Sequence, residues 1–368
     1  MLNLLLKLKN PIENLLSKAV EISKNKINIS FLIFSLIIVT YVQSYVLSSF
    51  FLADDFLHMF QIANWSPLEF IFSQHGGHLY ITRNIVFLLM YKLFGMKSLY
   101  YFIIVLLTHL ISVLLLFRLI HYLTNNPVLA MIGVVVWGIS PINYSTLAWY
   151  SAFGHVLIAP FFLLFLHDIF RIERSELIFS LFTAMKWYLF YLIIATSFGV
   201  GLALVFISPV ILLILLNKHP EKTYIILSTL PVIFVIILLF YYNMDIYRFF
   251  GGEKKSISDF SQNTIIINNK QLLLIIEMSL KMAVYGIYSI ICFPLLLFKP
   301  FAKLNTLSYI TAMSFLIIYG IILIKNTKIK HTYYLALIIM SAAFIAVITY
   351  ARAPMYAISN FSMNDASI

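Results

Sequence analysis

The sequence predicts an all-α membrane protein, a polytopic transmembrane helical bundle of about ten spans. Hydrophobic residues make up 62% of the 368-residue chain and charged residues only 11%, a composition far from that of a soluble domain. Apolar runs long enough to cross a bilayer recur from end to end of the chain. These runs are continuous, whereas a transmembrane β-barrel would show alternating segments of about ten residues.

The amino-terminal segment, residues 1–28, sets the predicted orientation. It contains five lysines and two glutamates, an excess of positive charge that favours a cytoplasmic location. We expect this segment to form an amphipathic helix on the membrane surface. The apolar run that follows is too long for the h-region of a cleaved signal peptide. It is therefore predicted to be the first span, about 29–52, running outward.

Residues 81–96 decide the next part of the topology. This apolar stretch is short and contains two basic residues. If it crossed the membrane, Arg118 and the segment "RIERSE" (171–176), with its two arginines, would lie outside, against the positive-inside rule. We therefore predict that it forms a helix on the outer surface, within an extracytoplasmic first loop of about 53–98.

Nine further spans follow on this interpretation. They complete a transmembrane domain of residues 29–350, followed by a tail at 351–368. The run "KNTKIKH" (325–331) then lies outside, in conflict with the positive-inside rule, so the topology of 272–368 stays open. The predicted spans are 99–120, 127–147, 152–170, 177–198, 201–216, 224–243, 272–298, 305–324 and 332–350.

The net charge of +11 does not indicate a nucleic-acid-binding protein here. The lysines punctuate apolar spans, so we interpret them as topology signals and as contacts for the head groups of membrane lipids. The single cysteine, Cys292, excludes an intrachain disulfide. No nucleic acid is expected among the partners.

The first loop gathers ionisable residues in a chain that has few of them. Asp54 and Asp55 end the first apolar run, and two carboxylates are tolerated there only at the water boundary. If the next segment is helical, both share a face with His58. Carboxylates so placed can act as a general base or bind a divalent cation, Mg²⁺ or Mn²⁺. His75 and His78 have a loose metal-ligand spacing, but without a fixed third ligand we interpret them as solvated loop residues.

A basic residue and a second loop extend this candidate site. Arg83 can make a charge-assisted contact to phosphate. The second external loop, about 140–155, faces the same side and carries Trp149, Ser151 and His155, residue types that suit the binding of a sugar ring. Each feature also has a plainer structural interpretation: a helix cap for the aspartates, snorkelling for the arginine and an interfacial belt for the tryptophan. The convergence of several such residues on one face favours a site.

The pattern "ADDF…W…F…GGHLYITRNIVFLLMYKLFG" resembles the bacterial members of the GT-C superfamily of membrane glycosyltransferases. In that family an acidic pair opens the first external loop, and a short basic motif follows. The segment "LAWYSAFGHVLIAPFFLLFL" is similar to the family's second external loop and next span. The resemblance covers about residues 30–215. It departs from the family pattern where Asn84 follows the arginine in place of a frequent proline, and where His155 replaces an arginine or an acidic residue.

The resemblance implies roles for particular residues. Asp55, or else Asp54, would be the catalytic carboxylate that accepts a proton or positions a metal, with Asp55 preferred. Arg83 and His78 would contact the donor phosphate. The residues expected to line the substrate are His58, His75, Trp149, Ser151 and His155.

The predicted function is therefore sugar transfer from a polyprenyl-phosphate donor to an extracytoplasmic acceptor. The acceptor would be a glycan, lipid or protein in a cell-envelope polysaccharide or glycolipid pathway, and the expected location is the bacterial inner membrane. Inversion at the anomeric carbon is implied by the resemblance only. One alternative is a polysaccharide polymerase or ligase, favoured by the basic insert at about 244–271. Another is a transporter or flippase of lipid-linked sugars, which would place polar residues near the middle of the spans.

Overall fold

The computed structural model describes residues 27–75, 78–140 and 143–249, Gly251 and a few positions between 273 and 339. Within this part of the chain, helices dominate, as predicted for an all-α membrane protein. Four helices are long and apolar enough to cross a membrane: Ile27–Ser48, Ser98–Thr124 (α5), Tyr150–Glu173 and Lys222–Asn243. Shorter apolar helices accompany them: Pro127–Gly138 (α6), Leu181–Ser197 (α9) and Gly199–Leu215 (α10).

Several predictions fall on residues that the structure does not describe. They are the amino-terminal surface helix, most of the insert at 244–271, the last three spans and the tail at 351–368. The count of about ten spans therefore stays a prediction. What the described helices support is the coarser statement, a helical membrane protein.

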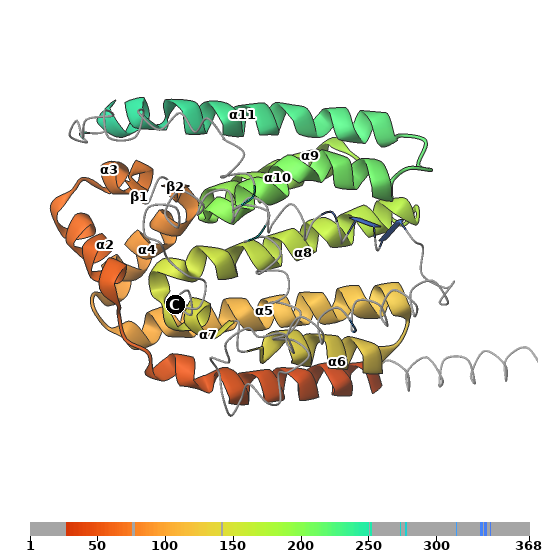
Figure 1. Ribbon diagram of the computed structural model, residues 1–368, viewed down its shortest axis with the longest axis horizontal. Helices are drawn as coiled ribbons and strands as arrows, with labels where there is room; N and C mark the ends of the chain where they lie inside the picture. Colours follow the sequence, from red (N-terminus) through yellow and green to blue (C-terminus); the bar gives the residue numbers. More distant parts are fainter. Residues whose placement is uncertain are drawn as a thin grey trace, which may run out of the picture.

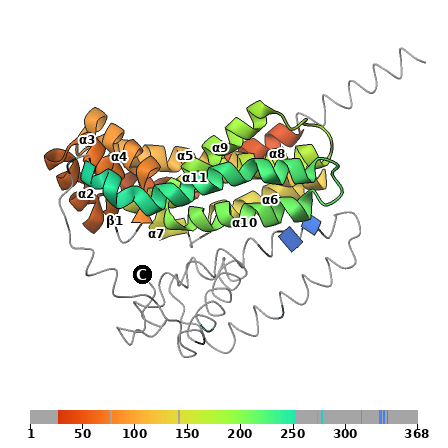
Figure 2. The same ribbon diagram turned by 90° about the horizontal axis from the view of Figure 1, so that it is seen from above.

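The long helices lie side by side, and the first loop caps one end of them (Figure 1). That loop contains helices Ala53–Asn64 (α2), Pro67–Phe72 (α3) and Ile81–Phe94 (α4) and a hairpin of Gln74–His75 (β1) with His78–Leu79 (β2). The view turned by 90° places these elements at the same end (Figure 2). The predicted helix over 81–96 is thus present, and it ends at Gly95, whose φ of 57° suits glycine.

The second loop returns to the same end of the bundle. It comprises Asn143–Ala148 (α7) and the short 3₁₀ turn Tyr150–Ala152 (η2), which leads into Phe153–Glu173 (α8). The connection from α8 to α9 lies at the opposite end, as does the connection from α10 to Lys222–Phe249 (α11) (Figure 1). The first and second loops therefore share one end of the bundle, as the predicted topology requires. Which end faces the cytoplasm stays a prediction.

The predicted span at 127–147 is wrong in length. The helix α6 ends at Gly138, and α7 is a separate short helix. The sequence has a proline at position 141, and proline lacks an N–H and disfavours helical geometry in the residue before it. Twelve residues rise only about 18 Å, which is less than the hydrocarbon thickness of a bilayer.

An aromatic core attaches the first loop to the bundle. Tyr150 is fully buried, and its ring centroid lies 4.8 Å from that of Phe87 on α4 and 4.8 Å from that of Tyr101 on α5. Phe51 packs edge-on against Tyr101 at 5.0 Å. Such edge-to-face pairs add specific geometry to the burial of apolar area. The loop is therefore a packed cap that holds its polar side chains in fixed positions.

Close helix packing sets the other wall of this end. A Cβ atom at Gly154 on α8 would overlap the carbonyl oxygen of Ser197 at the end of α9. Only glycine permits that approach, which brings the junction between α9 and α10 against the start of α8. Thr82 on α4 also hydrogen-bonds Thr196 on α9, with the two hydroxyl oxygens 2.6 Å apart. The cap and the bundle are thus joined on two sides.

Candidate active site

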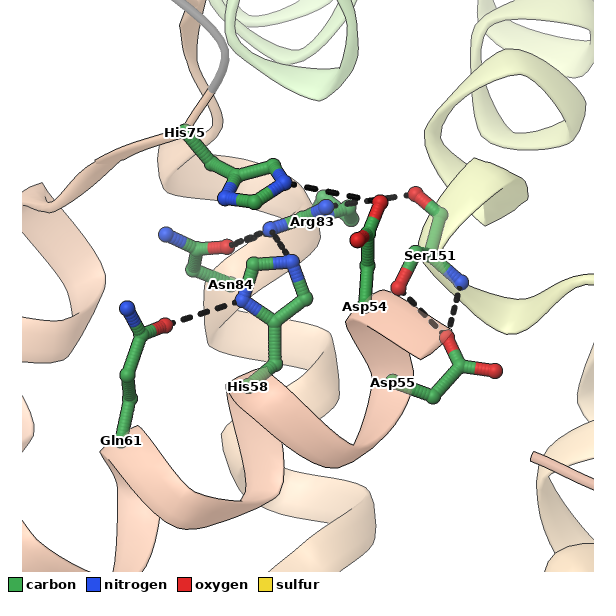
Figure 3. A network of polar contacts seen from close by, with 8 residues as sticks. All are labelled: Asp54, Asp55, His58, Gln61, His75, Arg83, Asn84 and Ser151. Carbon is green, nitrogen blue, oxygen red and sulfur yellow. Dashed lines mark hydrogen bonds and ion pairs between the residues drawn. The ribbon is translucent and has the colours of Figure 1, made fainter. Parts of the chain in front are cut away.

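The two adjacent aspartates at the start of α2 lie in different environments (Figure 3). Asp55 is fully buried, at 0% exposure. Its Oδ2 accepts a hydrogen bond from the Leu52 backbone N–H at 2.9 Å, and its Oδ1 accepts from the Ser151 N–H at 2.6 Å and the Ser151 hydroxyl at 2.5 Å. Asp55 therefore caps its own helix and also fixes the second loop to the first.

Burial and hydrogen bonding act in opposite directions on Asp55. Desolvation is the larger effect and raises the pKa of the carboxyl above its ordinary value, while the hydrogen bonds from Leu52 and Ser151 partly offset the rise. The carboxylate is accepting three hydrogen bonds and is shielded from solvent. A group in this position is well placed to organise the loops.

Asp54 is the accessible member of the pair. Its side chain is 38% exposed, and its Oδ2 lies 3.5 Å from Nε2 of His75, which is also partly exposed. Figure 3 shows the two side chains directed toward each other across the front of the network. The structure therefore leaves one carboxylate and one imidazole open to an approaching molecule.

His58 is a buried neutral link between α2 and α4. It is only 1% exposed. Its Nδ1 lies 3.0 Å from Oε1 of Gln61, and its Nε2 lies 3.1 Å from a guanidinium nitrogen of Arg83. Arg83 can only donate, so Nε2 accepts and Nδ1–H donates to Gln61. Burial, with the nearby Arg83 charge, lowers the pKa of His58 to about 3, which keeps the ring neutral at physiological pH.

Arg83 is a buried cation at the centre of the network. It is 2% exposed, and it donates to the Ser151 carbonyl at 3.2 Å and to Oδ1 of Asn84 at 2.7 Å. The guanidinium carbon also lies 4.2 Å from the centre of the Tyr80 ring, a cation–π distance. No carboxylate forms an ion pair with Arg83 among the residues that the structure describes. Burial lowers the pKa of Arg83 to about 10, so it stays charged.

Two polar residues of the network were not predicted as site residues. Asn84 is fully buried; it accepts from Arg83 and donates to the carbonyl oxygens of Phe70 at 3.0 Å and Ile71 at 3.3 Å. Gln61 accepts the hydrogen bond from Nδ1–H of His58, the tautomer that Arg83 requires. The sequence did contain a signal for Asn84, which is the single amide residue in the apolar run 81–96. A buried amide is normally hydrogen-bonded, so an amide in an apolar segment indicates polar partners nearby.

The second loop supplies Ser151 to the network but places two other predicted residues elsewhere. Trp149 keeps a buried indole N–H without a hydrogen-bond partner in the described part of the chain. His155 packs against Phe198, with ring centroids 3.6 Å apart. The ring centroid of Phe198 lies 5.1 Å from that of Tyr80. His155 is thus connected to Arg83 through two aromatic rings and not by direct contact.

His78 lies on strand β2, where its backbone pairs with that of His75. Its side chain is outside the described part of the structure. The predicted contact between His78 and a donor phosphate therefore stays a prediction.

The fit of a divalent cation is different for the two aspartates. Within the described residues, no group of three His, Cys, Asp or Glu side chains could hold a metal ion. Asp55 already accepts hydrogen bonds at both carboxylate oxygens. Asp54 and His75 lie close enough to provide two ligands. If a cation binds, Asp54 with His75 fits it better than the Asp54–Asp55 pair.

Comparison with known proteins gives no family for this chain. No protein-family model matches it, and no curated protein matches it significantly. The function is therefore argued from the site.

Proposed function

We propose that this protein is a membrane glycosyltransferase that moves a sugar from a polyprenyl-phosphate donor to an acceptor at the extracytoplasmic face. The proposal rests on three features that lie together: a buried arginine, an accessible carboxylate and a packed cap over one end of an apolar bundle. A lipid-linked donor keeps its tail in the membrane, so its phosphate and sugar would lie at the end of the apolar bundle, beside the cap. The resemblance of the sequence to GT-C enzymes supports the same reaction class.

The observation that carries the proposal is the uncompensated charge of Arg83. A buried ion without a partner is unfavourable by several kcal/mol, and proteins normally supply a counter-ion. Arg83 instead has neutral partners: an amide, an imidazole and a carbonyl. Asp54 and Asp55 affect Arg83 only over a longer distance. A donor phosphate held close to the guanidinium would supply the missing negative charge, and Arg83 would stabilise the charge that develops as the phosphate leaves.

Asp54 is our candidate for the base, in place of the Asp55 that the sequence favoured. In the proposed step, the acceptor hydroxyl oxygen attacks the anomeric carbon, and the bond from that carbon to the phosphate oxygen breaks. The polyprenyl phosphate leaves with the bonding electrons, and the hydroxyl proton passes to the Asp54 carboxylate. Asp54 suits this role because it is exposed beside His75, whereas Asp55 is buried under Ser151.

A divalent cation would give Asp54 a different role. Asp54 and His75 would then hold the ion, which would offset negative charge on the leaving phosphate. Both roles require the Asp54 carboxylate and leave Asp55 as the residue that orders the two loops. They differ in whether chelation removes activity.

The test of this proposal is the binding of polyprenyl phosphate, the predicted leaving group. It should raise the thermal stability of the purified protein by an amount that grows with the ligand concentration L as RT ln(1 + L/Kd). In Arg83→Gln, loss of a charge-assisted contact should weaken this binding by about 10- to 100-fold. Because Arg83→Gln also changes the stability of the free protein, the readout is the rise above each protein's own ligand-free stability, from which Kd is obtained at each ligand concentration.

The matched control is Arg248→Gln, near the carboxyl end of α11. Arg248 is partly exposed, and a carboxylate, Asp245, lies 3.7 Å from it. Its loss should leave polyprenyl phosphate binding within about twofold, as expected for a screened surface charge. Equal binding by wild type and Arg83→Gln would remove the main support for the proposed function.

The alternative of transport gains little from the one buried ion pair within the described spans. Asp168 is 7% exposed, and Lys186 Nζ lies 2.5 Å from its Oδ2. The sequence interpretation placed the important ionisable residues at the outer surface and missed this pair. Asp168 lies five residues before the end of α8, about 8 Å along the axis. A transport site would be expected nearer the middle of the spans.

A further inference from the structure

Four polar residues meet where α5 packs against α8, at the end of the bundle opposite the candidate active site. Arg118 and Tyr122 are i,i+4 neighbours on α5, and His167 and Arg171 are i,i+4 neighbours on α8, so each pair shares a helix face. The ring centroids of Tyr122 and His167 lie 5.8 Å apart. The charges of both arginines act on the His167 imidazole. These residues therefore form one cluster across the helix contact.

The carboxylate of Asp168, the acid next to this cluster on α8, already has partners. It accepts from the Trp187 indole N–H at 3.0 Å and pairs with Lys186 at 2.5 Å. The Lys186 charge thus offsets the negative charge of Asp168. Asp168 is not available to neutralise the two arginines as well.

The next basic residue, Arg174, is also engaged. Its guanidinium carbon lies 4.2 Å from the centre of the Tyr122 ring, and it donates to the Tyr122 carbonyl oxygen at 3.1 Å. The negative charge of Glu176 acts on Tyr122 together with the positive charge of Arg174, so these two charges offset each other there. Glu173 accepts a hydrogen bond from the Tyr333 hydroxyl at 2.7 Å. The nearby acids therefore have other partners.

Two cationic side chains and one imidazole nitrogen of this cluster have no hydrogen-bond or ion-pair partner among the described residues. Arg118 and Arg171 are exposed, and their side chains form no hydrogen bond or ion pair in the described part of the chain. Nε2 of His167 is buried and has no hydrogen-bond partner there. Buried polar atoms in proteins are nearly always paired. This nitrogen lies near two arginines without a counter-ion, so one anion could be the partner of all three groups.

We propose that this cluster binds the phosphate of an anionic lipid head group. Two guanidinium groups can share the phosphate oxygens, and His167 can supply a further N–H. The lipid origin follows from position: Leu107 and Ile111 are exposed apolar residues on the same face of α5 as Arg118, by their i+4 and i+7 spacing. Acyl chains would lie along this stripe while the phosphate reaches the arginines. The predicted topology puts the cluster at the cytoplasmic leaflet, which is rich in anionic lipid.

Native mass spectrometry of the full chain tests this, using titration with phosphatidylglycerol and, separately, phosphatidylcholine. The wild-type protein should bind phosphatidylglycerol more tightly. Each arginine near an anionic surface contributes about fivefold in affinity, so Arg118→Gln/Arg171→Gln should weaken phosphatidylglycerol binding by about 25-fold. Phosphatidylcholine binding should change by less than about twofold, because its head group has no net charge.

Lys222→Gln is the control, since it removes a positive charge at the same end of the bundle. The Lys222 ammonium donates to the Asn217 carbonyl at 3.0 Å and lies on α11, outside the cluster. An equal loss of binding in this variant would show a general surface-charge effect and overturn the proposal. The proposal would also be overturned if the wild type and Arg118→Gln/Arg171→Gln bound phosphatidylglycerol with equal affinity. Should the double variant fail to accumulate, the two single variants should each show the fivefold loss.

A second arm separates a lipid from a soluble phosphate. In lipid-free detergent, inorganic phosphate at millimolar concentration should change the thermal stability of the wild type and of Arg118→Gln/Arg171→Gln equally, whereas phosphatidylglycerol should stabilise the wild type more. If inorganic phosphate alone stabilises the protein as well as the lipid does, and Arg118→Gln/Arg171→Gln abolishes the effect, the lipid assignment is wrong. The readout in both arms is the difference between the wild type and Arg118→Gln/Arg171→Gln, which both keep Arg83, so the result is independent of the proposed function.

Discussion

Each end of the bundle buries an aspartate, but the two ends balance its charge differently. At the α8–α9 end, Asp168 pairs directly with Lys186. At the capped end, Asp55 has only neutral donors, and the buried Arg83 nearby has only neutral acceptors or packing partners. A buried charge left without a partner is destabilising by about 3–5 kcal/mol, so stability alone does not explain an unpaired Arg83. We infer that the capped end keeps its cation unpaired because a ligand completes it.

The largest expected effect separates the two adjacent aspartates. Asp54→Asn should reduce sugar transfer by at least about 100-fold, the low end for a lost general base, with unfolding almost unchanged because Asp54 is exposed. Asp55→Asn should instead lower the free energy of unfolding by about 1–3 kcal/mol, since the new amide N–H₂ would face a donor. A transfer assay and thermal unfolding of both variants measure this.

The opposite pattern would reverse the assignment. If Asp55→Asn folds normally and loses transfer while Asp54→Asn stays active, Asp55 is the catalytic carboxylate despite its burial. If the double variant Asp54→Asn/Asp55→Asn keeps full activity, neither residue carries the reaction. The site would then have to be sought elsewhere.

The pH dependence of stability tests the neutral state of His58. Its pKa falls from 6.5 in the unfolded chain to about 3 in the folded protein. The unfolded chain therefore binds more protons between these values, and stability should decrease as pH falls from 6.5 toward 3. The expected slope from this group is up to about 1.4 kcal/mol per pH unit.

His58→Gln is the matched variant for this measurement. Glutamine does not titrate, and its amide oxygen can accept from Arg83 in place of Nε2. Thermal unfolding of the variant between pH 7 and pH 5 should show a shallower decrease than that of the wild type. Identical slopes would mean that His58 is not buried in its neutral form, which would also weaken the case for an uncompensated Arg83.

Loss of the Lys186 charge, at the end of the bundle opposite the cap, should have an intermediate effect on the free energy of unfolding. Lys186→Met leaves Asp168 with the Trp187 N–H as its remaining partner. Removing one member of a well-buried pair costs about 3–5 kcal/mol, but Lys186 is about one-third exposed, so we expect about 1–2 kcal/mol. The second mutation Asp168→Asn should recover part of this loss. Additive losses in thermal unfolding would contradict a direct pair.

Much of the helical arrangement could be predicted from the sequence. The apolar runs gave the described long helices, and the placement of basic residues put the first two external loops at one end. The break after α6 was missed, although Pro141 was visible, because hydropathy alone continues to 147. The length of an apolar run was given more weight than the local effect of proline.

The candidate site was predictable as a set of residues but not as an arrangement. Asp54, Asp55, His58 and Arg83 lie within one loop, so their approach needed only a compact cap. Which aspartate is buried depends on how α2 turns toward the second loop, and no local pattern records that contact with Ser151. The pair between Asp168 and Lys186 on separate helices was missed for the same reason.

The smallest expected effect comes from the contact that holds the two loops together. Ser151→Ala removes one neutral-to-charged hydrogen bond to Asp55 but keeps the backbone N–H, which donates to the same oxygen at 2.6 Å. The free energy of unfolding should fall by about 1 kcal/mol, and the transfer rate should change by less than about tenfold, because Asp54 and Arg83 keep their positions. A loss as large as that of Asp54→Asn, in a variant that unfolds like the wild type, would mean that the Ser151 hydroxyl takes part in the reaction. Asp55 and Ser151 would then belong to the chemistry, and the division between an ordering aspartate and a reacting one would have to be abandoned.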